Sequence, residues 1–138
     1  MGRSFAYECP KCGYRAKVSG GADRGVIACV QTVLCRDCKA LYDAVLRFKL
    51  PDGIPPPSAQ AGFANSVQGR LARNLPPPMH LVLERLRYTG AKRFKWVRFD
   101  LQCPVSRDHR VRSWNDPDRC PKCGIYLQKS ALPYRLWE

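Results

Sequence analysis

The sequence predicts a small, β-rich protein that is stabilised by bound metal ions more than by a large apolar core. Six of its eight cysteines fall in three C-x-x-C pairs, a spacing in which one tight turn offers two thiolates to a metal ion. The segments between the pairs are short, β-branched runs separated by Gly and Pro, which is typical of short strands. Two separate units within 138 residues would each be small, and units below about 70–80 residues usually need disulfides or a metal.

Two of the cysteine pairs lie in the first third of the chain. The first spans residues 9–12 and the second residues 35–38, with 22 residues between them. This separation suits a tetrahedral site in which four thiolates bind one ion. In a chain that begins without an apolar leader, C-x-x-C pairs favour metal over disulfides. We therefore expect one metal ion to be held by Cys9, Cys12, Cys35 and Cys38.

Short strands are predicted around these pairs. Residues 14–18 leave the first pair as a strand, and residues 19–25 are rich in turn-forming Gly, Ser and Asp. Residues 26–34 return as an apolar, β-branched run that ends at the second pair, so we expect a hairpin here. Residues 41–48 then leave the second pair as a further strand.

This order of cysteine pair, hairpin, cysteine pair and strand resembles a zinc ribbon over residues 5–50. The resemblance implies one structural Zn²⁺ with four cysteine ligands. Residues 7–14 (Y-E-C-P-K-C-G-Y) also resemble the first loop of rubredoxins, which would imply an iron electron carrier with the same tetrahedron of sulfurs. Residues 35–39 lack the Pro and Gly of the second rubredoxin loop, and the chain is basic, so structural zinc is the preferred interpretation.

Proline marks both ends of residues 51–78, and the residues between are small and polar. Because runs of proline favour extended polyproline II, we expect a semi-rigid linker between two modules. The N-terminal module is the predicted zinc ribbon of residues 1–50. The C-terminal module is residues 79–138.

The sequence period changes after the linker. Apolar residues recur at helical spacing over residues 79–86, which predicts a helix that Gly90 can end. Residues 92–101 then carry β-prone aromatics in loose alternation, which predicts a strand leading into Cys103. The C-terminal module is therefore expected to combine a helix, a strand and a second zinc knuckle.

The second metal site begins with three cysteines: Cys103, Cys120 and Cys123. The candidates for the fourth ligand are His109, Cys29, His80 and water. His109 is the expected ligand because it lies in the loop between the cysteines and can fold back at small entropic cost. Cys29 falls in an apolar strand and His80 on the charged side of its helix. The two sites together predict two bound zinc ions.

The last cysteine pair carries a second resemblance. Residues 103–104 (C-P) and 120–127 (C-P-K-C-G-I-Y-L) are similar to small heavy-metal-binding domains, which read C-P-M-H-P, a short gap and C-P-K-C-G-M. Val105, Ser106 and Ile125 replace the Met, the His and the second Met of that pattern. The resemblance implies a short metal-bound fold, and metal handling is a lesser alternative for the function.

No motif in the sequence predicts catalysis. Zinc deaminases combine H-x-E with P-C-x-x-C, but His109 is followed by Arg110 and Val111, with no glutamate in place. Patterns such as H-E-x-x-H, G-x-S-x-G or a P-loop are also missing from the sequence. With two histidines, one of them an expected metal ligand, general acid–base chemistry has few candidates. We expect a protein that is not an enzyme.

The formal net charge of +13 favours polyanionic partners, with nucleic acid first among them. Residues 69–112 contain eleven basic and three acidic residues, with Phe94, Trp96 and Phe99 interleaved. Cations beside aromatic platforms suit single-stranded RNA or DNA, although the same rings could instead be core residues. The candidate nucleic-acid-binding residues are Arg85, Arg87, Lys92, Arg93, Lys95, Trp96, Arg98, Arg110 and Arg112. The first functional hypothesis is a basic nucleic-acid-binding adaptor.

The C-terminal residues 132–138 are unusually apolar for a chain end. They either dock on the protein's own core or offer an anchor to a partner protein. The alternative function is accordingly a protein–protein interaction module or an accessory subunit of a larger complex. Because no apolar run approaches the roughly 20 residues of a membrane span, we expect a soluble, cytoplasmic protein with no membrane partner.

Overall fold

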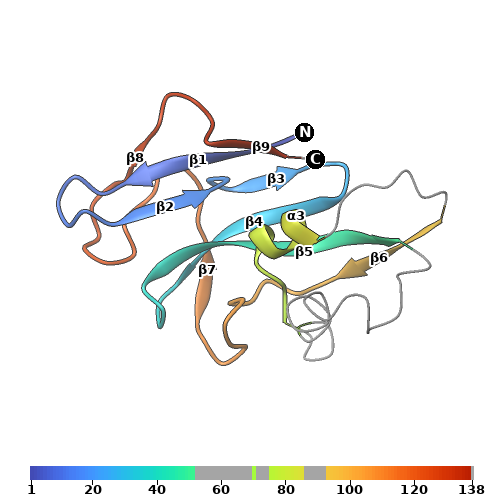
Figure 1. The fold of residues 1–138 in the computed structure, drawn as a ribbon. Helices are drawn as coiled ribbons and strands as arrows, with labels where there is room; N and C mark the ends of the chain where they lie inside the picture. The colour runs from blue at the N-terminus through green and yellow to red at the C-terminus, as the bar shows by residue number, and fades with distance from the viewer. Residues whose placement is uncertain (52–69, 71–74, 86–92, 138) are drawn as a thin grey trace.

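The computed structural model describes residues 1–51, 70, 75–85 and 93–137, in which two antiparallel sheets and helix α3 are formed (Figure 1). This architecture agrees with the predicted small, β-rich fold class. Within the described ranges, no helix combines the length and the apolar character that crossing a membrane requires. The elements are β1 (Gly2–Glu8), β2 (Arg15–Val18), β3 (Ala22–Arg24), β4 (Ala28–Cys35), β5 (Ala40–Pro51), α3 (Met79–Arg85), β6 (Phe94–Arg98), β7 (Val111–Ser113), β8 (Gln128–Lys129) and β9 (Arg135–Trp137).

The first sheet brings the two ends of the chain together. Its central strand β1 pairs with β2, β8 and β9, each time antiparallel. Gly2 lies opposite the buried Trp137, and a Cβ at this glycine would collide with the indole ring. The tail therefore docks on the protein through Trp137, whereas Leu132, Tyr134 and Leu136 stay exposed.

The second sheet has the strand order β3-β4-β5-β6, and β7 pairs with the end of β4 that β3 leaves free. Side chains of β5 alternate between two faces: Phe48 and Leu50 pack in the core, and Arg47 and Lys49 lie on the opposite face. The strands predicted over residues 26–34 and 41–48 are confirmed as β4 and β5. The strand predicted before Cys103 is confirmed as β6.

Helix α3 covers the core face of β5. Met79 and Val82 are buried in one cluster with Val45 and Phe48, as the helical spacing requires (Figure 1). The helix predicted after the linker is therefore confirmed. Its apolar stripe closes the core of the second sheet.

The predicted linker of residues 51–78 falls for the most part outside the described residues. Its C-terminal end is described, and there Pro76 and Pro77 are fully buried. Pro78 forms a bridge with Ala44 of β5. This end of the segment packs on the second sheet, unlike a solvated spacer.

The hairpin predicted for residues 14–34 is wrong. β2 pairs with β1, and β4 pairs instead with β3, β5 and β7. The reason is the turn at residues 19–21, which leads the chain from the first sheet into the second. Gly20 has a φ of 87° in this turn, and its N–H donates to Thr32 Oγ1 at 3.0 Å, which fastens the turn to β4.

Candidate metal centres

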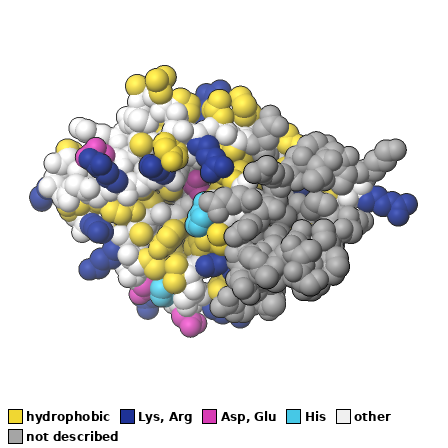
Figure 2. Space-filling view, in the orientation of Figure 1, with side chains coloured by type: hydrophobic (Ala, Val, Ile, Leu, Met, Phe, Trp, Pro, Cys, Tyr) yellow, Lys and Arg dark blue, Asp and Glu magenta, His cyan; other side chains and the backbone are white. Residues whose placement is uncertain are grey.

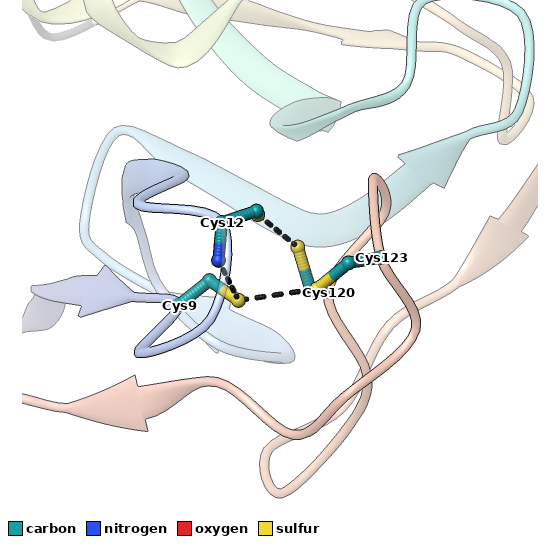
Figure 3. A group of neighbouring side chains, drawn as sticks. All are labelled: Cys9, Cys12, Cys120 and Cys123. Carbon is teal, nitrogen blue, oxygen red and sulfur yellow. Dashed lines mark hydrogen bonds between the residues drawn. The ribbon is translucent and has the colours of Figure 1, made fainter.

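The first cluster of metal-ligating side chains is the four-cysteine group, which consists of Cys9, Cys12, Cys120 and Cys123. The first two follow β1, and the last two lie in the loop before β8, so the pairing of β1 with β8 brings the two loops together (Figure 3). All four sulfur atoms lie within 4.8 Å of one another. Cys9 and Cys120 are buried, and Cys12 is exposed.

The two loops of this group share one sequence, C-P-K-C-G, and one turn geometry. In each, the glycine N–H donates to the carbonyl of the first cysteine, from Gly13 to Cys9 at 3.0 Å and from Gly124 to Cys120 at 3.1 Å. Both glycines have positive φ, 76° and 82°, a conformation that other residues adopt only at a cost. The repeated sequence thus builds two matching halves of one site.

The second cluster is the cysteine–histidine group, which consists of Cys35, Cys38, Cys103 and His109. Cys35 ends β4, Cys38 lies in the turn before β5, and the other two lie between β6 and β7. Nδ1 of His109 lies 3.6, 3.3 and 3.5 Å from the sulfur atoms of Cys35, Cys38 and Cys103. The imidazole therefore points one ring nitrogen at three sulfurs.

The spacing of these atoms suits a tetrahedral ion. Zn²⁺ with Zn–S near 2.3 Å and Zn–N near 2.0–2.1 Å would separate two sulfurs by about 3.8 Å and a sulfur from a nitrogen by about 3.6 Å. The observed sulfur separations are 3.7 Å for Cys12–Cys120 and 3.8 Å for Cys38–Cys103. Cys9 and Cys123 are closer, at 3.2 Å, yet remain free thiols. Both groups could hold a metal ion.

Local electrostatics also favour thiolate ligands with a cation between them. The N–H of Cys12 points at the sulfur of Cys9 at 3.4 Å, and the N–H of Cys38 points at the sulfur of Cys35 at 3.3 Å. Such donors stabilise a negative sulfur. Burial raises the pKa of the Cys103 thiol to about 11, and a cation bound beside the sulfur would lower it.

All eight ligand residues expected from the sequence lie in these two groups, but they are paired differently. The expectation joined residues 9–12 with 35–38, and His109 with the pair at 120–123. Each group instead combines one N-terminal pair with ligands from the C-terminal part of the chain. The pairing of β1 with β8 and of β4 with β7 decides this arrangement. Cys29 and His80, the other protein candidates for the fourth ligand, lie in neither group.

Trp114 packs beside the four-cysteine group and is fully buried. Its ring meets Tyr7 edge to face, with centroids 5.2 Å apart, and its Nε1 donates to the Arg119 carbonyl at 2.9 Å. Cys9 and Cys120 belong to the same apolar cluster. These two cysteines of the first group are therefore part of a small apolar core.

A buried carboxyl group links the two sheets without a metal. Asp43 of β5 accepts hydrogen bonds from the N–H and Oγ of Ser19, the latter at 2.9 Å, and from Thr32 Oγ1 at 2.6 Å. Burial raises the pKa of Asp43 to about 6, although these hydrogen bonds favour the charged form. The junction therefore titrates in the mildly acidic range.

The predicted nucleic-acid-binding residues that the structure describes do not form a single patch. Arg110 and Arg112 lie at β7, and Arg112 is paired with Asp118 at 2.8 Å, which holds the pKa of that carboxyl below its usual range. Figure 2 likewise shows Lys and Arg side chains scattered over the described surface of one face. The side chain of Arg85, and Arg87 and Lys92 as a whole, lie outside the described residues. The remaining candidates lie on or beside β6: Arg93, Lys95, Trp96 and Arg98.

Strand alternation sorts the aromatic residues of this region into two classes. Phe99 packs against the core together with Val97, so the alternative interpretation, that the rings are core residues, holds for Phe99 alone of the three rings. Phe94 and Trp96 lie on the opposite face, where Phe94 is 43% exposed. We call this face the β5–β6 outer face, and it consists of Arg47, Lys49, Phe94, Trp96 and Arg98.

Rings and cations are in direct contact on the β5–β6 outer face. The Arg47 guanidinium lies 5.0 Å from the Trp96 ring centroid, and Lys49 Nζ lies 4.4 Å from that of Phe94. The sequence interpretation missed Arg47 and Lys49 because they precede the basic stretch of residues 69–112. The signal was the alternation R-F-K-L over residues 47–50, which places two cations on the face opposite the core.

Comparison with protein-family models, with curated proteins and with solved structures finds no match for this chain.

Proposed function

We propose that this chain is a non-catalytic zinc protein that binds single-stranded nucleic acid and serves as an adaptor. The observation that carries the proposal is the β5–β6 outer face, where two aromatic rings and three cations share one side of a sheet. The strong positive charge of the chain supports the same class of ligand. The two metal groups would serve as the scaffold that holds this sheet.

The chemistry of the β5–β6 outer face suits single-stranded nucleic acid better than a nucleic-acid duplex. Phe94 and Trp96 offer flat surfaces on which bases can stack, and stacking contributes about 1–3 kcal/mol per base. Arg47, Lys49 and Arg98 stand between and beside the rings, within reach of the phosphates that link stacked bases. Stacking tolerates every base, so we expect little sequence preference.

Zinc is the metal that these ligand sets favour. Four thiolates, or three thiolates and one imidazole, in a closed tetrahedron are typical of structural zinc. Iron in the same four-cysteine geometry would be an electron carrier and would give a coloured protein. Metal analysis of the purified chain should find two zinc ions per molecule, and iron would favour the rubredoxin-like alternative.

Binding of a labelled 12-nucleotide single strand, as RNA and as DNA, tests the nucleic-acid proposal. We expect affinity that falls steeply with salt, because each neutralised phosphate contributes a slope of about −0.7 to log K against log salt. The double variant Phe94→Ala/Trp96→Ala should bind at least about tenfold more weakly, because two stacking platforms are lost. Circular dichroism and zinc content confirm that each variant is folded.

Tyr126→Ala is the matched control. Tyr126 is also an exposed aromatic beside an arginine, Arg119, but it lies in the loop before β8. Its removal should leave binding unchanged. The proposal fails if neither RNA nor DNA binds at low salt, or if the double variant binds as well as the unaltered chain.

The exposed apolar residues near the C-terminus support a second candidate, a protein-interaction module or accessory subunit. Leu132 is 78%, Tyr134 56% and Leu136 55% exposed, and Figure 2 shows hydrophobic side chains over the loop between β8 and β9. Polar substitution of Leu132 and Leu136 should abolish partner capture and leave zinc content unchanged, because the tail is held by the buried Trp137 and by the backbone pairing of β9 with β1, not by these exposed side chains. Capture that survives both substitutions would exclude this surface.

A further inference from the structure

A cavity of about 850 Å³ lies next to the β5–β6 outer face. Its described lining includes three arginines, Arg47, Arg98 and Arg107, and one acidic residue, Asp100. Cys29, the cysteine that belongs to neither metal group, lies in the same wall. The volume falls in the range of small-ligand sites, and the excess of cations favours an anion.

Two of the cavity's arginines are placed where they repel each other. Arg47 and Arg98 are direct cross-strand partners on β5 and β6, a position in which like charges destabilise a sheet. In the part of the chain that the structure describes, neither of them forms an ion pair. An anion bound between the two guanidinium groups would replace this repulsion with two attractive interactions.

The surroundings hold Arg47 in a fixed orientation. Its Nε donates to the sulfur of Cys29 at 3.2 Å, and its guanidinium lies over Trp96. These contacts use Nε and one face of the group and leave the two terminal nitrogens as donors. A guanidinium already held in place loses little freedom when it binds a ligand.

An irregularity in the sheet opens the space beside these residues. The pairing of β4 with β5 steps from Cys29–Arg47 to Val30–Val45, so Leu46 is an extra residue in β5. Such bulges bend a strand and redirect its side chains. The Leu46 carbonyl accepts the N–H of Phe99 at 2.8 Å, and both residues line the cavity. The bulge thus joins the end of β6 to the cavity wall.

We propose that this cavity binds a phosphate group, with Arg47 and Arg98 as its principal ligands. The planar fork of a guanidinium matches two phosphate oxygens, and two such forks match a phosphate better than a halide or a single carboxylate. The phosphate can belong to a free mononucleotide or to the backbone of a single-stranded nucleic acid that binds the β5–β6 outer face. The site stands on the cavity itself and does not require the nucleic-acid proposal.

Equilibrium dialysis of the zinc-loaded full chain against three probes tests the inference. The probes are inorganic phosphate, adenosine monophosphate and a 12-nucleotide oligothymidine. Arg98→Gln removes one guanidinium, and Cys29→Glu introduces a carboxylate beside Arg47. Each should weaken binding at least about tenfold, whereas Arg15→Gln, which alters an exposed arginine of β2, should leave it unchanged.

Each outcome decides the inference. Binding of phosphate or the mononucleotide that both cavity variants weaken assigns a small ligand. Binding of the oligonucleotide alone, again weakened by both, assigns a backbone phosphate. Failure of all three probes to bind, or binding that either Arg98→Gln or Cys29→Glu leaves unaltered, overturns the site.

The same data separate this inference from the proposed function. If oligonucleotide binding is weakened by Phe94→Ala/Trp96→Ala but not by Cys29→Glu, the result supports the proposed function and overturns the phosphate site. A mononucleotide that binds in the cavity while no oligonucleotide binds supports the phosphate site and removes the function.

Discussion

The four-cysteine group and the cysteine–histidine group hold the same two parts of the chain together with different local chemistry. The first uses two copies of C-P-K-C-G, each closed by a glycine with positive φ. The second uses one C-x-x-C turn, followed by Lys39 at a φ of 50°, and takes its other two members from the segment between β6 and β7. Both groups nevertheless join distant segments, with 108 residues from Cys12 to Cys120 and 65 from Cys38 to Cys103.

This comparison shows why sequence order is a weak guide to metal-ligand pairing. The entropic cost of closing a loop grows only with the logarithm of its length, and each doubling adds about 0.6 kcal/mol. A site that joins neighbouring pairs therefore has only a small advantage over one that joins the two ends of the chain. The pairing of β1 with β8 and of β4 with β7 contributes more free energy than this difference in loop-closure entropy costs.

Removal of the metal should produce the largest effect, because both groups connect the same segments. Structural zinc contributes roughly 10–16 kcal/mol in small zinc-binding peptides, as much as the whole stability of a typical domain. We expect a strong chelator to abolish the near-ultraviolet circular dichroism and the hydrogen-exchange protection of both β1 and β4, and zinc to restore them. Cooperative thermal unfolding of the fully metal-free chain would contradict the shared role.

Loss of the core beside the four-cysteine group should have the next largest effect. Trp114→Ala removes a fully buried indole and its hydrogen bond to Arg119, and we expect the free energy of unfolding to fall by about 3–5 kcal/mol in urea titrations. Trp96→Ala on the β5–β6 outer face is the matched control and should cost less than about 2 kcal/mol. Equal losses would mean that the first group has no core of its own.

The turn residues offer a direct test of the difference between the groups. Gly13→Ala and Gly124→Ala should each lower the free energy of unfolding by about 1–2 kcal/mol through backbone strain, since a Cβ at either position meets no neighbour within 4 Å. Lys39→Gly should change it by less than about 1 kcal/mol, in the stabilising direction. Thermal unfolding of the zinc-loaded variants measures both, and a destabilising Lys39→Gly would show that the lysine side chain has another role.

The hydrogen-bonded contact of Asp43 with Ser19 and Thr32 should have the smallest effect on the free energy of unfolding, and that effect depends on pH. Because the pKa of Asp43 is raised from 3.8 to about 6 in the folded chain, the folded state holds a proton that the unfolded state releases. This contribution is present near pH 4 and is lost as the pH rises through 6. Relative to Asp43→Asn, the free energy of unfolding of the unaltered chain should therefore fall by about 1 kcal/mol between pH 5 and pH 7.

For Asp43 the quantity to measure is the difference in free energy of unfolding between the unaltered chain and Asp43→Asn. Acid also weakens the metal sites, but it does so in both proteins, so this effect cancels in the difference. Urea titrations of zinc-loaded protein at several pH values supply it. A constant difference across this range would show that the carboxyl is charged throughout.

Much of the fold follows from local sequence. Alternation and β-branched runs predict β2, β4, β5 and β6, and helical spacing predicts α3, because each pattern describes a side-chain period that the element must satisfy. The eight residues of the two candidate metal groups follow from residue type and spacing. Strand partners do not, because β8 and β9 have only two and three residues and their pairing with β1 depends on contacts between the two ends of the chain.

One signal could have predicted the pairing of the metal ligands. The residues at 9–13 and 120–124 are identical, and two identical turns are suited to form the two halves of one site. The residues at 35–39 differ, and they pair with Cys103 and His109, which lie on no such turn. The side of the sheet on which Trp96 lies, in contrast, could not be predicted from composition. The sequence does not distinguish an aromatic residue on the outer face from one on the core face until the strand register is known.

The most direct test of the cross-chain pairing is zinc-edge X-ray absorption of the double variant Cys120→Ser/Cys123→Ser. Because these cysteines share a site with residues 9–12, their loss should leave one zinc per chain, bound by three sulfurs and one nitrogen from the cysteine–histidine group. A remaining zinc bound by four sulfurs would mean that residues 9–12 and 35–38 share one ion, and would contradict the account.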